Sequence, residues 1–248
     1  MYGWRARLGL LVPSINTTME TELWQIAPRG VSVHTARIAG GRHGTPEELR
    51  SMEEESKHAA KRVAMTEPDV VIYACTSGSF FEGPEWNTKI RAQLTDITGA
   101  PTVTTAGAMT GALQRAGARK VAVVTPYVEL TNERLKAFLG AHGIEVTRLA
   151  TFDMLDMFDH AKILPDEIYR KAKDAAAASA DADAVFVACT QLRALEVVDM
   201  LERDLGLPVY SAVQTTAWQA FDLLGIDPQI TDCGSLLRQL SERHGAAH

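Results

Sequence analysis

The sequence predicts an α/β protein of two pseudo-symmetric lobes, each a parallel four-stranded sheet flanked by helices. Three observations lead to this prediction. Short runs rich in β-branched residues alternate with longer stretches of helical period, as in βαβ units. Motifs of the first half recur in the second half. The 248 residues, of which 46% are hydrophobic, can form one large α/β domain or two lobes with sizeable cores.

The strands are predicted where apolar, β-branched runs are bounded by Gly, Pro and polar residues. The first set comprises Leu8–Val12, Val31–Arg37, Val70–Ala74 and Thr102–Thr104. The second set comprises Val121–Thr125, Glu145–Leu149, Ala184–Ala188 and Val209–Ala212. Helices are expected in the gaps, most clearly at Pro46–Thr66, Asn132–His142, Pro165–Ser179 and Ala194–Leu205, several of which have Gly or Pro at an end.

An internal duplication relates the two sets. The string RLGLLVP from Arg7 resembles KVAVVTP from Lys120, and DVVIYACT from Asp69 resembles DAVFVACT from Asp183. A third pair is APTV and LPVY, which begin at Ala100 and Leu207. Matching segments in the same order predict the same strand order in both lobes, related by a pseudo-two-fold axis.

Composition narrows the class of ligand. The net charge of −6, from 25 basic and 31 acidic side chains, argues against nucleic acid or an anionic membrane as partner. No apolar run approaches the ~20 residues of a membrane span, and the N-terminal run is too short for a signal peptide. We therefore expect a cytoplasmic protein that binds a small molecule.

Cysteine usage and motif content argue against disulfides, metals and cofactors. The three cysteines are too few for a disulfide framework, and neither they nor the seven histidines have the spacing of a metal site. GGRHG at Gly40–Gly44 lacks the residues of a phosphate-binding loop and is better interpreted as a flexible loop or lid over a cleft. We expect neither a metal nor an organic cofactor.

Polar residues follow four of the predicted strands. Ligands of open parallel sheets bind beyond the carboxyl ends of the strands, so these residues are expected to converge if the lobes face each other. They are Ser14, Asn16, Cys75, Thr76, Tyr127, Cys189 and Thr190.

The two Cys-Thr turns, ACTSGS and ACTQLR, carry the functional hypothesis. Backbone amides at such a turn attract anions and lower a thiol pKa from its usual ~8.5, and the same amides can bind a carboxylate. A single cysteine at a strand end is more often an inert core residue, but duplication favours function for Cys75 and Cys189, whereas Cys233 has no such context. The candidate ligand groups at the turns are Thr76, Ser77, Gly78, Thr190 and Gln191. Two such turns predict a small dicarboxylate or substituted acid as substrate.

The segment VPSINTTME has two interpretations. Thr17 or Thr18 is expected to cap the following helix, which leaves the Asn16 amide free to hydrogen-bond a substrate carboxylate. Tyr127, at the position that corresponds to Ser14, could pack on the opposite lobe or donate a proton near the reacting carbon.

These motifs resemble those of the maleate cis-trans isomerases, within the superfamily of aspartate/glutamate racemases, hydantoin racemases and arylmalonate decarboxylases. VPSINTTMETE, ACTSGSF, VTPYVELTNERL and ACTQLRALEV occur in the expected order, and the likeness spans nearly the whole chain. Arylmalonate decarboxylases have glycine in place of the first cysteine, and glutamate racemases follow their second cysteine with Thr-His, unlike Gln191 here.

The resemblance implies roles for particular residues. Cys75 would be the nucleophile, Cys189 its acid/base partner, Asn16 a carboxylate ligand and Tyr127 a group that holds the substrate and its developing charge. Maleate isomerases usually carry a further substrate-binding asparagine where FDMLDMFDHAK here offers Asp159 and His160, so His160 is the candidate ligand there.

The resemblance also implies an aspartate/glutamate racemase-like fold in which the last helices return to the first lobe. The predicted division is 1–105 plus 213–248 for the first lobe and 106–212 for the second. A homodimer or larger homo-oligomer is implied as well.

The leading hypothesis is cofactor-independent isomerisation of maleate to fumarate through a succinyl-cysteine-like adduct on Cys75, with Cys189 exchanging the proton. The alternatives are a two-cysteine amino-acid or hydantoin racemase and a non-catalytic small-acid binding protein. The racemase would exchange a solvent proton at an α-carbon, and the binding protein would need neither thiol.

Overall fold

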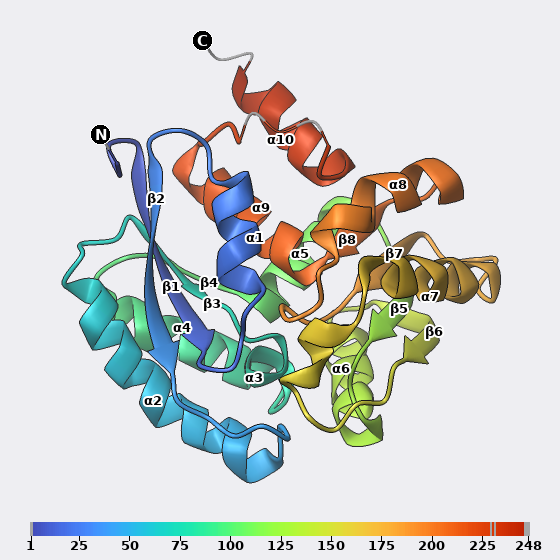
Figure 1. The fold of residues 1–248 in the computed structure, drawn as a ribbon, viewed down its shortest axis with the longest axis horizontal. Coiled ribbons are helices and arrows are strands. Elements are labelled where there is room, and N and C mark those ends of the chain that lie inside the picture. Colours follow the sequence, from blue (N-terminus) through green and yellow to red (C-terminus); the bar gives the residue numbers. More distant parts are fainter. Residues whose placement is uncertain (1, 229, 231, 246–248) are drawn as a thin grey trace.

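Two parallel four-stranded sheets form the framework of the molecule. The structure, a computed structural model, describes residues 2–228, 230 and 232–245. The first sheet has the strand order β2-β1-β3-β4, and the second has the order β6-β5-β7-β8. The two halves of the chain therefore repeat one topology, and Figure 1 shows them side by side with helices around each sheet. The predicted fold class is confirmed.

The strands lie close to their predicted limits. The longest difference is at the first strand, which pairs with its neighbour in register from Ala6 to Pro13. The strands are β1 (Ala6–Pro13), β2 (Val31–Ile38), β3 (Val70–Tyr73), β4 (Thr102–Thr104), β5 (Lys120–Thr125), β6 (Glu145–Thr151), β7 (Ala184–Val187) and β8 (Val209–Ser211).

Helices connect the strands, as expected for βαβ units. They are α1 (Met19–Ile26), α2 (Pro46–Ala64), α3 (Thr76–Phe80), α4 (Pro84–Thr98), α5 (Thr105–Arg115), α6 (Glu129–Ala141), α7 (Pro165–Ala177), α8 (Leu195–Leu205), α9 (Ala212–Leu224) and α10 (Ser235–Gly245). A 3₁₀ helix, η1, spans Asp159–Lys162. Helix α2 shows why these segments are helical, since Thr45 and Glu48 form a reciprocal capping box around Pro46 at the first position.

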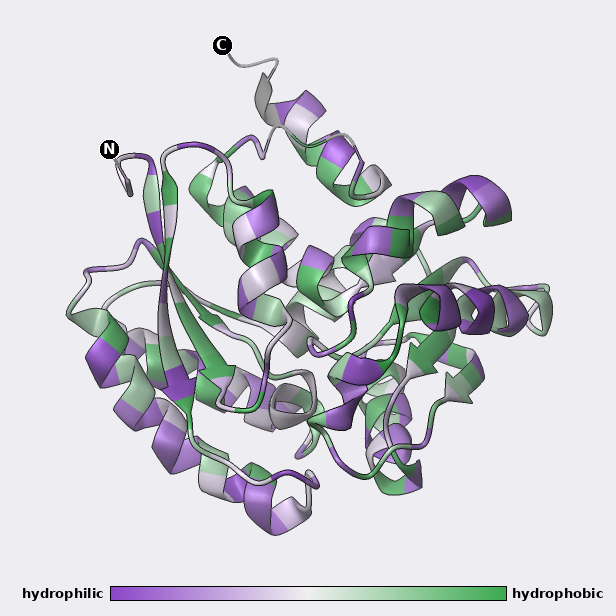
Figure 2. Cartoon of the chain, viewed as in Figure 1, coloured by the Kyte–Doolittle hydropathy of each residue, from purple (hydrophilic) through white to green (hydrophobic). Residues whose placement is uncertain are grey.

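The central strands form the core of each half. Every residue of β3 and β7 is buried, because helices cover both faces of each sheet. Figure 2 shows hydrophobic strands enclosed by helices whose outer surfaces are hydrophilic. Strands buried on both faces are continuous apolar runs in sequence, which is why β3 and β7 could be recognised from composition alone.

Helices α5 and α9 join the two halves. Helix α5 follows β4 directly and packs against α9, which contacts β3 and β4 of the first sheet as well as β8 of the second (Figure 1). The predicted boundaries at 105/106 and 212/213 fall at the starts of these two helices, and the division stays a prediction. Residues 1, 229, 231 and 246–248 of the predicted first lobe lie outside the described residues.

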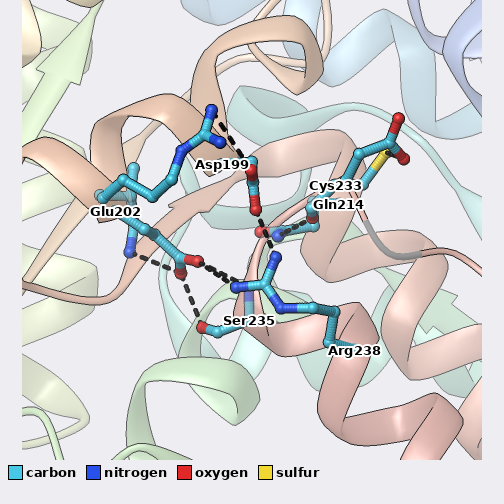
Figure 3. A network of polar contacts seen from close by, with 9 residues as sticks. Asp199, Glu202, Gln214, Cys233, Ser235 and Arg238 are labelled. Carbon is cyan, nitrogen blue, oxygen red and sulfur yellow. Dashed lines mark hydrogen bonds and ion pairs between the residues drawn. The ribbon is translucent and has the colours of Figure 1, made fainter.

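Polar contacts attach the last helix to α8. The Ser235 amide and hydroxyl donate to the Glu202 carboxylate at 2.6 and 2.7 Å, and Arg238 pairs with both Glu202 and Asp199 (Figure 3). The Gln214 side-chain amide of α9 donates to the Cys233 carbonyl at 2.6 Å. We call these contacts of α8 and α9 with α10 and the residues just before it the α10 joint. Cys233 lies in the α10 joint.

Candidate active site

The polar residues that follow four strands meet in one pocket between the two halves. The pocket is small and lies at the carboxyl ends of β1, β3, β5 and β7. Its lining is formed by Pro13, Ile15, Asn16, Cys75, Thr76, Ser77, Tyr127, Met157, His160, Cys189, Thr190 and Gln191. Both duplicated cysteines are buried and face this one space.

Cys75 connects β3 to the short helix α3 in an extended conformation. The Gly78 amide donates a hydrogen bond to its sulfur at 3.3 Å, and the Ser77 hydroxyl lies 3.8 Å away. A Cβ atom at position 78 would lie 2.9 Å from that sulfur. Glycine is therefore required here for the backbone to approach the thiol.

Cys189 occupies the corresponding place after β7, but with an unusual backbone. Its φ of +93° lies where residues other than glycine are rarely found. Strained conformations of this kind cluster at functional sites, where the surrounding structure holds them. The Gln191 amide donates to its sulfur at 3.4 Å, and Nδ1 of His160 lies 3.8 Å from it.

His160 is 1% exposed, and its ring orientation is determined by a backbone carbonyl. Its Nε2 lies 3.1 Å from the Met154 oxygen, which can only accept, so Nε2 carries the hydrogen. Burial lowers the pKa of His160 and favours the neutral ring. In that ring Nδ1 is an acceptor, and it faces the Cys189 thiol.

Burial raises the pKa of both thiols, and that of Cys189 rises to about 12. The amides of Gly78 and Gln191 act in the opposite direction, as the sequence predicted, but burial outweighs them. The expected lowering of the thiol pKa is therefore wrong. A water-excluding pocket disfavours the thiolate more than two backbone amides stabilise it.

Asn16, rather than a threonine, caps α1. Its Oδ1 accepts hydrogen bonds from the Thr18 and Met19 amides at 3.0 and 2.9 Å, and Thr18 makes no side-chain cap. The expectation that Thr17 or Thr18 would cap the helix is therefore wrong. Both oxygen lone pairs of Asn16 serve the helix, while its Nδ2 atom faces the pocket side and donates to Thr190 at 3.1 Å. Nδ2 has a second hydrogen that a ligand could accept.

The side chains that follow Cys189 bind the other lobe. Gln191 donates to the Ile15 carbonyl at 3.0 Å and accepts from the Thr17 amide at 2.8 Å. The Thr190 hydroxyl donates to the Ala74 carbonyl at 3.2 Å. These two candidate substrate ligands line the pocket, but their side chains hold the lobes together.

Two buried hydroxyls in the pocket lack partners. Thr76 Oγ1 and Tyr127 Oη have no hydrogen-bond partner among the described residues. A buried hydroxyl without a partner costs about 1–3 kcal/mol, so a bound ligand that accepts from it gains this energy. Burial, together with the nearby Cys189, raises the pKa of Tyr127 well above its usual value, so its phenol keeps its proton.

Two loops, one from each half, meet beside the pocket. The loop containing Gly40–Gly44 contacts the segment between β6 and η1, where the Met157 amide donates to the Arg42 carbonyl at 2.6 Å. The Arg42 guanidinium pairs with Asp156 at 2.6 Å. Met157 lines the pocket, so these contacts fix the position of one residue of the pocket wall.

The remaining predicted residues lie at the margin. Ser14 is exposed and donates to the Ile38 carbonyl at 3.0 Å, and Gly78 acts through its amide on Cys75. Neither is among the residues that line the pocket. Pro13, Ile15 and Met157 also line the pocket and were not predicted from the sequence. The first two flank the Asn16 motif, whereas Met157 lies in a loop whose sequence has no period to reveal it.

Within residues 2–228, 230 and 232–245, no group of three or more His, Cys, Asp or Glu side chains could hold a metal ion. No helix in the same part of the chain is both long and apolar enough to span a membrane.

Comparison with known proteins identifies the family. A family model described as arylmalonate decarboxylase matches residues 8–237. A maleate isomerase from Geobacillus stearothermophilus is 32% identical over 244 residues, which cover 93% of this chain and 96% of that protein. The chain belongs to this family of arylmalonate decarboxylases and maleate isomerases.

Solved structures of the family are similar over the whole fold. The Nocardia farcinica maleate cis-trans isomerase bound to TRIS is 28% identical, with a TM-score of 0.89 over 96% of this chain and 99% of that one. A cysteine-to-serine variant of that enzyme with a covalently bound succinylcysteine intermediate has a TM-score of 0.88 at 28% identity, over 94% and 98% of the two chains.

Proposed function

We propose that the protein isomerises maleate to fumarate through a covalent succinyl-cysteine on Cys75, with Cys189 as the acid and base. The observation that carries the proposal is that both cysteines share one pocket with the unpartnered hydroxyls of Thr76 and Tyr127. The maleate isomerase relatives and the succinylcysteine-bearing variant of one of them support it.

Isomerisation requires that the carbon–carbon double bond of the substrate become a single bond temporarily, because a double bond does not rotate. The Cys75 thiolate forms a bond to one alkene carbon, and the π electron pair moves to the other carbon, which takes the proton of Cys189. The adduct now has a single bond that rotates. The Cys189 thiolate then removes a proton from the same carbon, the double bond forms again, and the sulfur–carbon bond breaks to return the Cys75 thiolate.

The charge that develops on the substrate carboxylate needs donors already in place. The Thr76 and Tyr127 hydroxyls can be these donors. Neither has to give up a hydrogen bond to a described residue in order to turn toward a ligand. The Asn16 amide supplies a third donor through its second hydrogen. No cofactor takes part in these steps.

The charges around the pocket favour an unsaturated dicarboxylate over an amino acid. The described residues that line the pocket include no Asp or Glu to pair with a substrate ammonium group. An amino-acid racemase would need such a partner. A hydantoin racemase would not, and it stays the alternative enzyme.

Proton NMR of the reduced protein with maleate tests the proposal. We expect the maleate signal to fall as the fumarate signal grows. Unchanged maleate would overturn the proposal. If deuterium from the solvent appeared at the α-carbon of aspartate, glutamate or a hydantoin instead, the racemase would be supported. Ligand binding that persists after alkylation of both thiols, without turnover, would indicate a binding protein.

Three cysteine variants test the roles. Cys75→Ala should abolish turnover, and Cys189→Ala should slow it at least 10²-fold and let the adduct accumulate. Mass spectrometry should then find the mass of one maleic acid added to the Cys75 peptide. Cys233→Ala is the control, because this thiol lies at the α10 joint, and it should retain wild-type activity. An adduct on Cys189 would reverse the roles.

A further inference from the structure

The two cysteine turns are duplicates in sequence, yet their sulfurs have different neighbours. Beside Cys75 lie the Gly78 amide, a donor, and the Ser77 hydroxyl, which can donate or accept. Beside Cys189 lie the Gln191 amide, a donor, and Nδ1 of His160. The Tyr127 phenol also acts on Cys189 and, as a donor, lowers its thiol pKa. The imidazole differs from all of these groups, because in the neutral ring its Nδ1 can only accept.

The Met154 carbonyl decides what His160 can do. It holds the hydrogen on Nε2, which leaves Nδ1 without one in the neutral ring. At 3.8 Å, Nδ1 is within hydrogen-bond range of a sulfur and can only accept from the Cys189 S–H group. The contact therefore exists when Cys189 is a thiol and is lost when it is a thiolate.

We propose that His160 is a positioning residue that keeps Cys189 protonated, and that this assigns the acid role to Cys189 and the nucleophile role to Cys75. A hydrogen bond to the neutral form of an acid disfavours its ionisation. Both sulfurs have donors nearby, but no group beside Cys75 can only accept, so we expect Cys75 to ionise first. The assignment of the acid and nucleophile roles rests on the proposed function. The order in which the two thiols ionise does not.

The charged groups around His160 leave the ring neutral. Asp156 and Asp159 act on it through space, but each has a cationic partner, Arg42 at 2.6 Å and Lys162 at 2.6 Å. The other titratable groups near the pair are Tyr127, whose ring centroid lies 6.1 Å from that of His160, and the thiol of Cys75. Burial of the imidazole is the larger effect and opposes its protonation.

Thiol alkylation tests the proposal without any substrate. Each cysteine peptide is quantified by mass spectrometry after brief exposure to iodoacetamide at a fixed mildly alkaline pH. In the wild type, Cys75 should react faster than Cys189. In His160→Phe, which removes the acceptor and keeps a ring, the Cys189:Cys75 rate ratio should rise about 3- to 10-fold, since one hydrogen bond changes a pKa by roughly 0.5–1 unit.

The Cys189:Cys75 ratio also controls for a general loosening of the pocket. If the variant merely opened the pocket, alkylation of both cysteines would become faster and the ratio would not change. His142→Phe is the matched variant. It changes a half-buried histidine directly after α6 whose Nδ1 contacts the Phe138 carbonyl, and it should leave the ratio unchanged. A ratio that stays constant or falls in a folded His160→Phe protein would overturn the proposal.

A measurement on the wild type covers the case in which the variant fails to fold. In ¹⁵N NMR of histidine-labelled protein, His160 should be the tautomer with hydrogen on Nε2, and an Nδ1–H tautomer would overturn the proposal. If maleate is isomerised, the alkaline limb of kcat/KM should move to lower pH in His160→Phe. If maleate is unchanged but the alkylation ratio responds, the proposed function fails and the ordering of the thiols stands.

Discussion

Around Cys75 the backbone is packed directly against the sulfur. The Gly78 amide reaches the thiol because no side chain stands between them, and a Cβ atom there would also lie 2.8 Å from the Tyr73 hydroxyl. Since sulfur and phenol are both buried, neither can move far to make room. The glycine therefore controls the position of the proposed nucleophile.

Gly78→Ala should reduce kcat by at least about 10-fold, because displacement of a nucleophile by a fraction of an ångström lowers reactivity strongly. Steady-state kinetics with maleate measures the effect. Gly140→Ala is the control. This glycine is in α6 with no atom within 4 Å of an added Cβ, so we expect full activity and about 0.5–1 kcal/mol of added stability. Equal activity of the two variants would contradict the role given to Gly78.

At the scale of elements, the two loops that meet beside the pocket form a clasp between the halves. The Arg42–Asp156 ion pair is partly exposed, so its contribution to stability is small, about 0–1 kcal/mol. Its position beside Met157 suggests an effect on substrate entry rather than on folding.

Arg42→Ala should change the KM for maleate by about 3-fold or more, while the free energy of unfolding changes by less than about 1 kcal/mol. Kinetics and urea unfolding test the two parts. Arg50→Ala provides the comparison, because Arg50 pairs with Glu82 on the surface and contacts no pocket residue named above. A large loss of stability in Arg42→Ala would show that the clasp holds the fold itself.

A second contact between elements joins α1 to α8. Glu22 is 4% exposed and accepts from the Leu195 amide at 3.3 Å, while its Oε2 has no partner among the described residues. Burial raises the pKa of this carboxyl from 4.5 to about 8. The folded protein thus binds a proton that the unfolded chain releases, so this stabilisation is complete below pH 4.5 and is lost as pH rises through 8.

Glu22→Gln keeps an acceptor for Leu195 and cannot ionise. Its melting temperature should be close to that of the wild type near pH 5 and exceed it at pH 9, by the equivalent of about 3–5 kcal/mol, because one pKa unit corresponds to about 1.4 kcal/mol. Thermal unfolding at the two pH values gives the difference. Glu47→Gln, at an exposed position on α2, is the matched control for the loss of a carboxylate. A stabilisation by Glu22→Gln that is equal at both pH values would mean that Glu22 does not titrate as described.

At the scale of the whole molecule, the Glu202 carboxylate accepts several of the hydrogen bonds that attach α10. Glu202 of α8 is acceptor for the Val209 amide as well as for both donors of Ser235. Its removal leaves several partly buried donors without this acceptor, and a fully buried unpaired donor would cost about 1–3 kcal/mol.

Glu202→Ala should lower the free energy of unfolding by about 2–4 kcal/mol and leave kcat for maleate within about 2-fold, because it does not line the pocket. Denaturant unfolding and the fumarate assay measure both. Arg203→Ala, next to it and exposed, should alter neither. The homo-oligomer and the cytoplasmic location that were expected from the sequence stay predictions.

Much of the fold could be predicted because its signals are local. The continuous apolar run of β3 and the capping box of α2 each lie within a few residues of sequence, and the duplicated Cys-Thr turns show that the halves repeat. Asn16 makes one contact that could not be predicted, for the opposite reason. Its hydrogen-bond partner Thr190 is 174 residues away, and no local pattern shows which threonine will face it.

The sequence by itself determined the α/β class, the two similar halves, the family and the two cysteines, since each is written in the order and repetition of residues along the chain. Tertiary structure alone decided what surrounds each sulfur: glycine and serine beside Cys75, histidine beside Cys189, and unpartnered hydroxyls from Thr76 and Tyr127. The thiol pKa values follow from the same packing, because burial and hydrogen bonding depend on distances in space rather than along the chain.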